Sequence, residues 1–203
     1  MAAVDEILSR ARRTPVGEAA AQGAARFVKA AERENLVDVV FARVGSPFGE
    51  LLVAATPKGV VQLSLYGYDQ SETLEGLARK VSPRIFESPR RLDPVRKQLD
   101  EYFAGKRRTF DVDLDWQLSH GFALRVLEAT ARIPYGKVSS YREMAEKAGN
   151  VRATRAAGNA LGGNAIPVIV PCHRVLRSGG GLGGYGGGLA MKEALLKMEG
   201  ALL

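Results

Sequence analysis

The sequence predicts a mixed α/β protein, with an antiparallel sheet in its first part and a mostly helical second part. Three short apolar stretches follow one another along the chain, at 37–44, 50–55 and 59–65. The two turns between them contain the proline and glycine that tight reversals favour. After residue 118 the apolar residues recur at helical spacing instead. We therefore expect three segments, namely a helical or partly disordered extension at 1–35, an N-terminal α/β domain at 36–117 and a C-terminal domain at 118–203.

Three further elements are expected near the proposed border, two before it and one after it. A helix should begin with Asp93 as its N-cap and Pro94 in its first position, and Gly105 should end it. Residues 110–116 alternate apolar residues with aspartates, which predicts a half-buried strand or extended segment. A later helix carries its apolar residues on one face: Phe122, Val126, Ala129 and Ile133.

The composition is that of an ordinary globular protein, with 203 residues, 46% hydrophobic and 25% charged. No apolar run is long enough to span a bilayer, and the first residues lack the apolar core of a secretory signal. One cysteine cannot form an internal disulfide, which fits a reducing compartment. We therefore expect a cytoplasmic protein (nuclear in a eukaryote) with no membrane partner. One cysteine and two histidines are also too few for a conventional structural zinc site, so we expect no metal and no cofactor.

Positive charge is concentrated towards the C-terminus. Residues 1–120 hold 18 Lys and Arg against 17 Asp and Glu, whereas residues 121–203 hold 11 against 5. A localised basic surface favours a polyanionic partner such as nucleic acid, although a solvated basic face explains the charge about as well.

A helix-turn-helix is predicted at 139–163. The first helix, 139–148, should be capped by Ser139 or Ser140, and a second helix at about 152–163 follows the turn Gly149-Asn150. Its inward face holds Ala153, Ala157, Ala160 and Leu161, and its outward face holds Arg152, Arg155, Gly158, Asn159 and Gly162. Glycine inside a helix costs roughly 1 kcal/mol relative to alanine. Close approach of this helix to a DNA groove would explain why it contains two glycines, and so would packing against another helix.

The single cysteine, Cys172, directly precedes His173 and a run of glycines at 179–188. A thiol reacts as the thiolate, and a neighbouring histidine can act as its base if a carboxylate orients the ring. Glu199 lies at the edge of the apolar face of the last helix, about 189–199, so it can supply that carboxylate. Tyr185, within the glycine run, suggests a wall or lid for a flat apolar ligand. A buried structural thiol remains the alternative at this point.

Four segments match the pattern of a known family: IPYGKVSSY (133–141), AGNVRATRAAGNALGGN (148–164), IPVIVPCHRVL (166–176) and GYGGGLAMKEALLKMEG (184–200). They resemble the O6-alkylguanine-DNA alkyltransferases, or methylated-DNA–protein-cysteine methyltransferases, over roughly 36–203. The resemblance implies a ribonuclease H-like N-terminal domain and a winged-helix-like, helix-turn-helix DNA-binding domain. It also implies DNA repair by a single, irreversible transfer of the alkyl group from O6 of a flipped guanine to Cys172. Activity on O4-alkylthymine stays open.

The resemblance assigns roles to individual residues. The chemical roles are alkyl acceptor for Cys172, base through a water for His173, orienting carboxylate for Glu199, hinge for Asn164 and donor to the departing guanine for Tyr141. Arg155 would fill the gap left in the duplex, Tyr185 would line the alkyl pocket, and the main chain of Cys172, Val175 and Gly186 would read the base. The DNA-binding set is Arg152, Arg155, Gly158, Asn159, Gly162 and Arg174. The expected partner is double-stranded DNA that contains O6-alkylguanine, bound by a monomer.

Two departures and two rival functions remain. Gly186 stands where some relatives have serine, and 119–123 differs from the usual segment before the first C-terminal helix. One rival is a non-enzymatic relative that binds the lesion without repairing it, although such proteins replace the cysteine. The other is a cysteine hydrolase, which would need a base from elsewhere in the chain, and His120 is the other histidine.

Overall fold

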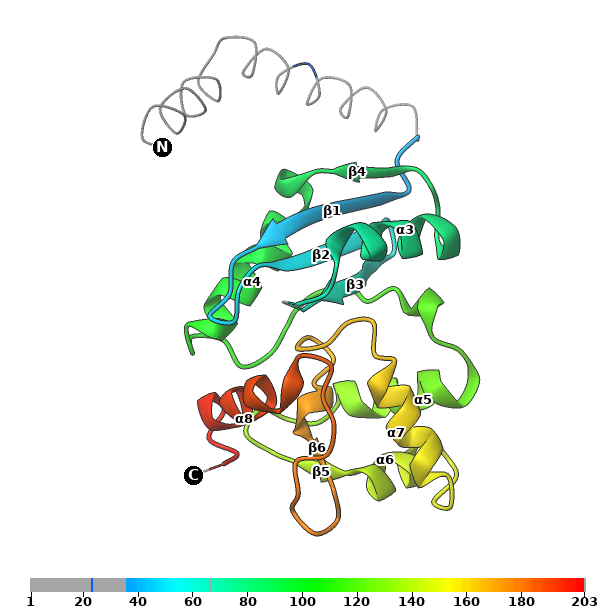
Figure 1. Cartoon of the computed structure of the whole chain (residues 1–203), viewed down its shortest axis with the longest axis vertical. Coiled ribbons are helices and arrows are strands. Elements are labelled where there is room, and N and C mark those ends of the chain that lie inside the picture. The colour runs from blue at the N-terminus through cyan, green and yellow to red at the C-terminus, as the bar shows by residue number, and fades with distance from the viewer. Residues whose placement is uncertain (1–22, 24–35, 66, 203) are drawn as a thin grey trace, which may run out of the picture. The chain divides into compact units, whose positions relative to one another are not determined.

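The computed structural model describes residue 23 and residues 36–65 and 67–202, and Val39–Leu203 forms one compact unit (Figure 1). The extension expected at 1–35 lies, apart from Gly23, outside the described residues. Because contacts do not divide Val39–Leu203 further, the border near 117 stays a prediction. We refer to 39–117 as the sheet part and to 118–203 as the helical part.

The predicted antiparallel meander is confirmed, but the sheet contains a fourth strand. Its first three strands are β1 (Val39–Val44), β2 (Leu51–Thr56) and β3 (Gly59–Ser64). The sequence analysis missed β4 (Ile85–Glu87), which pairs parallel with β1 and gives the order β3-β2-β1-β4. The sheet is therefore mixed rather than wholly antiparallel.

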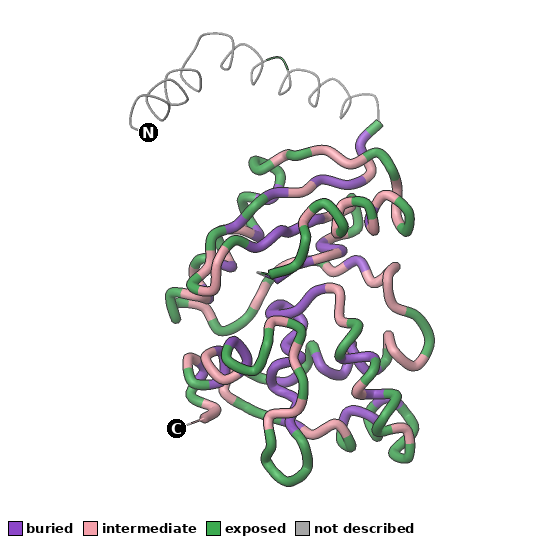
Figure 2. Tube along the Cα trace, viewed as in Figure 1, coloured by how far each residue is buried: buried purple, intermediate pink, exposed green. Residues whose placement is uncertain are grey.

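Both faces of the sheet are buried, as the buried segments of the strands in Figure 2 indicate. Helix α3 (Gln70–Lys80) and helix α4 (Asp93–Phe103) lie on opposite faces (Figure 1). Alternate strand residues form a core with Leu77 of α3: Val39, Leu52, Ala54 and Val61. Helix α4 buries Val95, Leu99 and Tyr102, one residue per turn.

Helix α4 begins differently from the prediction. A short 3-10 turn, η1 (Pro89–Leu92), leads directly into it, so Leu92 occupies the cap position and Asp93 is already helical. The Asp93 carboxylate instead accepts a hydrogen bond from Arg96 at 2.8 Å. Gly105, at φ 70°, follows the end of the helix as predicted.

The edge of the sheet at β3 is covered by two other segments. Residues 110–115 form an extended segment, one of the two predicted outcomes, and Trp116 already begins a 3-10 turn. The segment meets β3 through hydrogen bonds between Val60 N and Asp113 O and between Asp115 N and Val60 O, both 2.8 Å. Gly59 makes this approach possible, because a Cβ there would lie 2.3 Å from Asp113 O. Farther along, Leu63 N donates to Ala165 O at 2.8 Å.

The helical part contains the predicted helix-turn-helix. Its helices are α5 (Gly121–Ala131), α6 (Tyr141–Lys147), α7 (Thr154–Gly162) and α8 (Gly188–Met198), preceded by the turn η2 (Trp116–Leu118). A two-residue parallel pair, β5 (Ser139–Ser140) with β6 (Val175–Leu176), holds the start of α6 beside the segment that follows Arg174. Ser140 caps α6 in a capping box with Glu143. None of the described helices is long and apolar enough to cross a membrane.

Helix α7 starts two residues later than predicted. Its first residue is Thr154, so Arg152 lies in the preceding turn, where it is exposed. Ala157, Ala160 and Leu161 are buried as expected, and the outward residues Arg155, Asn159 and Gly162 are exposed. Gly158 is half-buried, beside the ring of Tyr141.

Candidate active site

The residues before the cysteine form a tight turn rather than a strand. Val170 N donates to Ile166 O at 2.9 Å, and Val168 adopts φ 73°. A β-branched residue rarely occupies this left-handed region, and such a conformation costs of order 1–3 kcal/mol. The turn leads into the 3-10 helix η3 (Cys172–Arg174), which fixes the direction of the Cys172 side chain.

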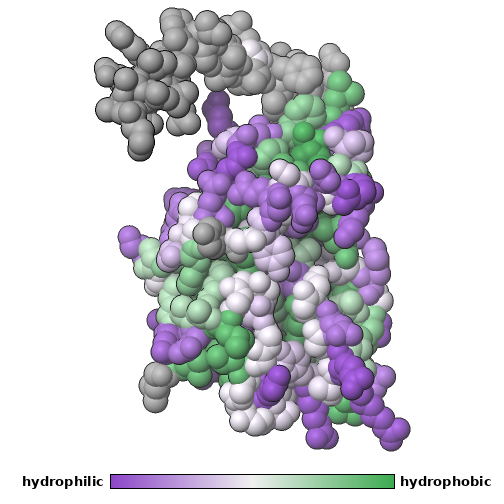
Figure 3. Space-filling model, in the orientation of Figure 1, coloured by the Kyte–Doolittle hydropathy of each residue, from purple (hydrophilic) through white to green (hydrophobic). Residues whose placement is uncertain are grey.

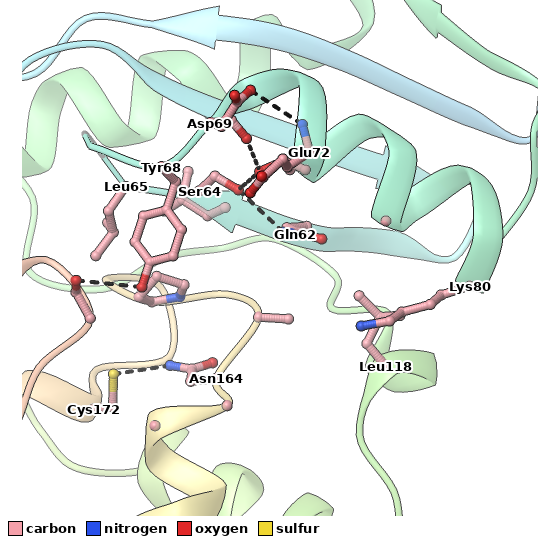
Figure 4. A pocket seen from close by; sticks show the side chains of 18 of the residues that line it. Gln62, Ser64, Leu65, Tyr68, Asp69, Glu72, Lys80, Leu118, Asn164 and Cys172 are labelled. Atoms are coloured by element: carbon pink, nitrogen blue, oxygen red, sulfur yellow. Dashed lines mark hydrogen bonds between the residues drawn. The ribbon is translucent and has the colours of Figure 1, made fainter.

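Asn164 connects the end of α7 to the thiol (Figure 4). Its Nδ2 donates to Cys172 Sγ at 3.2 Å and to Val170 O at 2.9 Å, and its Oδ1 accepts from Ile166 N at 3.0 Å. Burial raises the pKa of the Cys172 thiol, and the Asn164 hydrogen bond acts in the opposite direction. Asn164 therefore favours the thiolate while it holds the turn together.

Three buried side chains meet at the buried Glu199, and the four residues together are called the buried relay below: Tyr102, His173, Arg174 and Glu199. His173 Nε2 lies 3.0 Å from Glu199 Oε1, and Tyr102 Oη donates to the same oxygen at 2.6 Å. Arg174 donates to both carboxylate oxygens, each at 2.8 Å. Glu199 is 5% exposed, as its position on the last helix predicts.

The electrostatics of the buried relay determine which nitrogen of His173 carries the proton. Burial raises the pKa of Glu199, but the hydrogen bonds from His173 and Arg174 outweigh it and lower that pKa to about 2. Burial lowers the pKa of His173. At neutral pH a neutral imidazole therefore faces a carboxylate, so Nε2 carries the hydrogen and Nδ1 has a free lone pair. No protein group in the described part of the chain hydrogen bonds to that buried Nδ1.

The position of Arg174 contradicts the DNA contact expected for it. The residue is 6% exposed, and besides its two bonds to Glu199 it donates to Ile133 O at 2.6 Å. A guanidinium occupied in this way neutralises Glu199 instead of meeting phosphate.

Lys192 of α8 is a site residue that the sequence analysis missed. Its buried Nζ donates to Val175 O at 2.6 Å and also to Leu182 O and Gly184 O. Burial lowers the pKa of Lys192 to about 8. The side chain ties the glycine-rich loop to α8, and the only signal for it in the sequence is a charge beside the buried Met191. The Val175 carbonyl, expected to read the base, is thus already one of the acceptors of Lys192.

The thiol lies where two cavities meet. The helix cavity, about 580 Å³, is lined by Tyr141, Arg155, Gly158, Asn159 and Gly183, among others. The sheet cavity, about 610 Å³, is lined from the other part by Gln62, Ser64, Tyr68 and Glu72, and also by Asn164. Five residues line both: Leu161, Gly162, Cys172, Tyr185 and Gly186. Arg152 and Val175 line neither cavity.

The glycine-rich loop fits closely around the site and forms a pale, near-neutral strip on the surface in Figure 3. Gly183 has φ 70°, and a Cβ there would lie 2.5 Å from Tyr141 Oη. A Cβ at Gly187 would lie 2.5 Å from Met191 Sδ. Tyr185 packs edge-on against His173, with the ring centres 6.2 Å apart. Tyr185 thus lies beside the histidine and lines both cavities, while its role as a wall for the ligand stays a prediction.

The fold and site together have the features of a DNA-binding protein, with a buried thiol beside the DNA-binding helices. A helix-turn-helix presents an arginine and little other side chain, and next to it a thiol adjoins a neutral histidine–carboxylate pair. No three His, Cys, Asp or Glu side chains gather into a metal site within residue 23, 36–65 and 67–202.

Comparisons with known proteins identify the family. The ribonuclease-like domain of 6-O-methylguanine DNA methyltransferase matches residues 39–116, and its DNA-binding domain matches residues 121–201. A methylated-DNA–protein-cysteine methyltransferase of Mycolicibacterium paratuberculosis is 38% identical over 161 residues, which cover 79% of this chain and 92% of that protein. The chain belongs to the methylated-DNA–protein-cysteine methyltransferase family, whose members are enzymes that move a methyl group from DNA to a protein cysteine.

Solved structures agree. The crystal structure of the Mycobacterium tuberculosis O6-methylguanine methyltransferase has a TM-score of 0.67 and 38% sequence identity, and it covers 80% of this chain and 93% of that chain. The crystal structure of Mycobacterium tuberculosis OGT in complex with DNA has a TM-score of 0.68 and 36% identity over the same shares. The predicted fold class, a ribonuclease-like sheet domain with a helical DNA-binding domain, is confirmed.

Proposed function

We propose that the protein repairs double-stranded DNA as a monomer, by moving the alkyl group of O6-alkylguanine onto its own Cys172. The observation that carries this proposal is the ionised Glu199 beside a neutral His173, next to a thiol that lines the same cavity as the helix-turn-helix. An alkylated guanine pairs poorly, so rotating it out of the duplex costs less than rotating a normal base. The helix cavity then receives the base.

The glycines of α7 support the approach of DNA to this helix. A Cβ at Gly158 would lie 3.7 Å from the Tyr141 ring, which is ordinary contact, and one at Gly162 would meet nothing within 4 Å. Packing within the described chain therefore does not require either glycine. Close contact with an outside surface explains both, and the exposed Arg155 on the same face can enter the space that the flipped nucleotide leaves.

The transfer balances without a cofactor. The thiol proton passes through a water to His173 Nδ1, and Glu199 stabilises the imidazolium. The thiolate attacks the first carbon of the alkyl group in line with the C–O6 bond, so a C–S bond forms as the C–O bond breaks. Guanine, still part of its nucleotide, leaves as an anion that Tyr141 stabilises by hydrogen bonding, and it takes up the proton that the His173 imidazolium gives back through water. The product is a thioether that water does not cleave, so each molecule reacts once.

The test is to incubate the protein with a duplex that contains one O6-methylguanine and to weigh the peptide that holds Cys172. We expect a gain of one methylene per protein molecule, together with the return of normal guanine. The Cys172→Ala variant should bind the duplex and transfer nothing. An unmodified Cys172 despite tight binding would contradict the proposal and favour lesion binding alone, and repeated turnover with release of alcohol would favour a hydrolase.

A further inference from the structure

The proposed function uses only one of the two cavities that meet at Cys172. The base enters the helix cavity from the side of α7 and Tyr141, which leaves the sheet cavity without a role. In an in-line displacement, sulfur, carbon and oxygen lie on one line, so the rest of the alkyl group must project sideways from that line. The sheet cavity adjoins the thiol and is large enough, at about 610 Å³, to take such a group.

Tyr68 is one of the residues that line the sheet cavity. It lies in the loop between β3 and α3, and in Figure 4 its ring points from that loop towards Cys172 and Asn164. Its Oη donates to Gly186 O at 3.4 Å, a contact between residues 118 positions apart. Because the side chain is 53% exposed, it can move aside without unpacking a core.

The hydroxyl of Tyr68 occupies the volume into which a side chain at position 186 would extend. Gly186 is not among the glycines with positive φ, so its backbone would accept a side chain. A Cβ at that position would, however, lie 2.8 Å from Tyr68 Oη. Tyr68 thus fills, from the sheet part, the volume that a side chain on the active-site loop would occupy.

We propose that the sheet cavity receives the part of the O6 substituent beyond its first carbon, and that Tyr68 limits the size of that substituent. This inference rests on the proposed function. It assigns a role in substrate specificity to the sheet part, which otherwise reaches the site through the hydrogen bond of Tyr102 to Glu199. A smaller residue at position 68 leaves more room in the sheet cavity for the substituent, and a larger residue leaves less.

The experiment compares single-turnover rates on two duplexes, one with O6-methylguanine and one with O6-benzylguanine, measured by the mass of the Cys172 peptide. The readout is the ratio of the benzyl rate to the methyl rate. Tyr68→Ala should raise this ratio by about tenfold or more, the scale on which pocket shape discriminates substrates. Tyr68→Trp should lower it, and Tyr68→Phe, which keeps the ring, should change it least.

Leu189→Ala is the matched control, because it also truncates an exposed large apolar residue (52% exposed) but lines neither cavity. Its ratio should equal that of the unmodified protein. An unchanged ratio in both Tyr68→Ala and Tyr68→Trp overturns the role of Tyr68 while methyl transfer still supports the proposed function. Absence of methyl transfer in the unmodified protein overturns the proposed function itself. If Tyr68→Ala unfolds, Tyr68→Trp alone decides by the direction of its change.

Discussion

The buried relay and the outer face of α7 lie in the same candidate active site but differ in exposure and in how their polar groups are paired. In the relay, Glu199 is paired with Tyr102 of α4 and with both His173 and Arg174 of η3. The outer face of α7 is exposed and holds an arginine among small residues. In the proposed function, the groups that move protons are therefore positioned before the substrate arrives, whereas DNA must complete the recognition surface.

This difference predicts two kinds of failure. A change in the buried relay leaves a charge or a donor without its partner inside the protein, so stability and rate should fall together. A change on α7 removes a contact that forms only with DNA, so binding and rate should fall while stability stays constant. If relay variants kept their stability, or if α7 variants lost theirs, the comparison would be contradicted.

The largest expected effect is that of Glu199→Ala. Removing one partner of a buried, paired charge leaves Arg174 uncompensated, which costs about 3–5 kcal/mol of unfolding free energy. Urea unfolding measures this loss. The control is Glu193→Ala, which removes an exposed partner of Lys197 and should change stability by less than about 1 kcal/mol. Equal losses in the two variants would show that the relay is not a stabilising unit.

Arg155→Ala should leave unfolding unchanged and slow alkyl transfer in duplex DNA by on the order of 10²-fold. Rotating a base out of the stack costs a few kcal/mol, and in the proposed function Arg155 offsets that cost by filling the space that the nucleotide leaves. The same lesion in single-stranded DNA needs no unpairing, so the defect there should be much smaller. A defect of the same size on both substrates would assign Arg155 to the chemistry instead.

Tyr102→Phe should cost about 1.5–3 kcal/mol at neutral pH, because it removes a hydrogen bond to a charged group. Since the pKa of Glu199 is lowered from 4.5 to about 2, its stabilisation is complete above pH 4.5 and is lost as the pH falls towards about 2. The difference between Tyr102→Phe and the unmodified protein should therefore shrink over that window. Tyr135→Phe, which loses a bond to the neutral Met198 carbonyl, should show no such pH dependence.

The smallest expected effect is that of Arg152→Ala, on the turn before α7. An exposed arginine that meets phosphate adds about one unit to the slope of log affinity against log salt. We expect that slope to decrease by about one, equally for lesioned and undamaged duplexes. A loss restricted to lesioned DNA would place Arg152 in base recognition.

Local patterns in the sequence were sufficient to name several residues of the candidate site. Cys172 next to His173, and Glu199 at the edge of an apolar helix face, are relations within one element or between adjacent residues. Arg174 was misassigned because its charge is visible in the sequence and its burial is not. A three-residue strand such as β4 is too short to produce a pattern, and its parallel pairing with β1 comes from tertiary contact.

Residues that reach the site from distant elements could not be predicted. Tyr102 meets Glu199 across 97 positions and Tyr68 meets Gly186 across 118, and both pairs depend on how the sheet part packs on the helical part. The left-handed Val168 is equally invisible, because valine in an apolar run predicts a strand. Glycine or asparagine at that position would have signalled the turn.

The covered edge of β3 has a consequence for how the chain can be divided. Backbone groups of Val60 and Leu63 are paired by Asp113, Asp115 and Ala165, the last of which belongs to the helical part. A fragment that ends near residue 117 would leave the N–H of Leu63 exposed on an apolar strand, and open strand edges recruit further strands. The sheet part expressed alone should therefore tend to aggregate, so its solubility depends on the same segment that carries Asn164 towards the thiol.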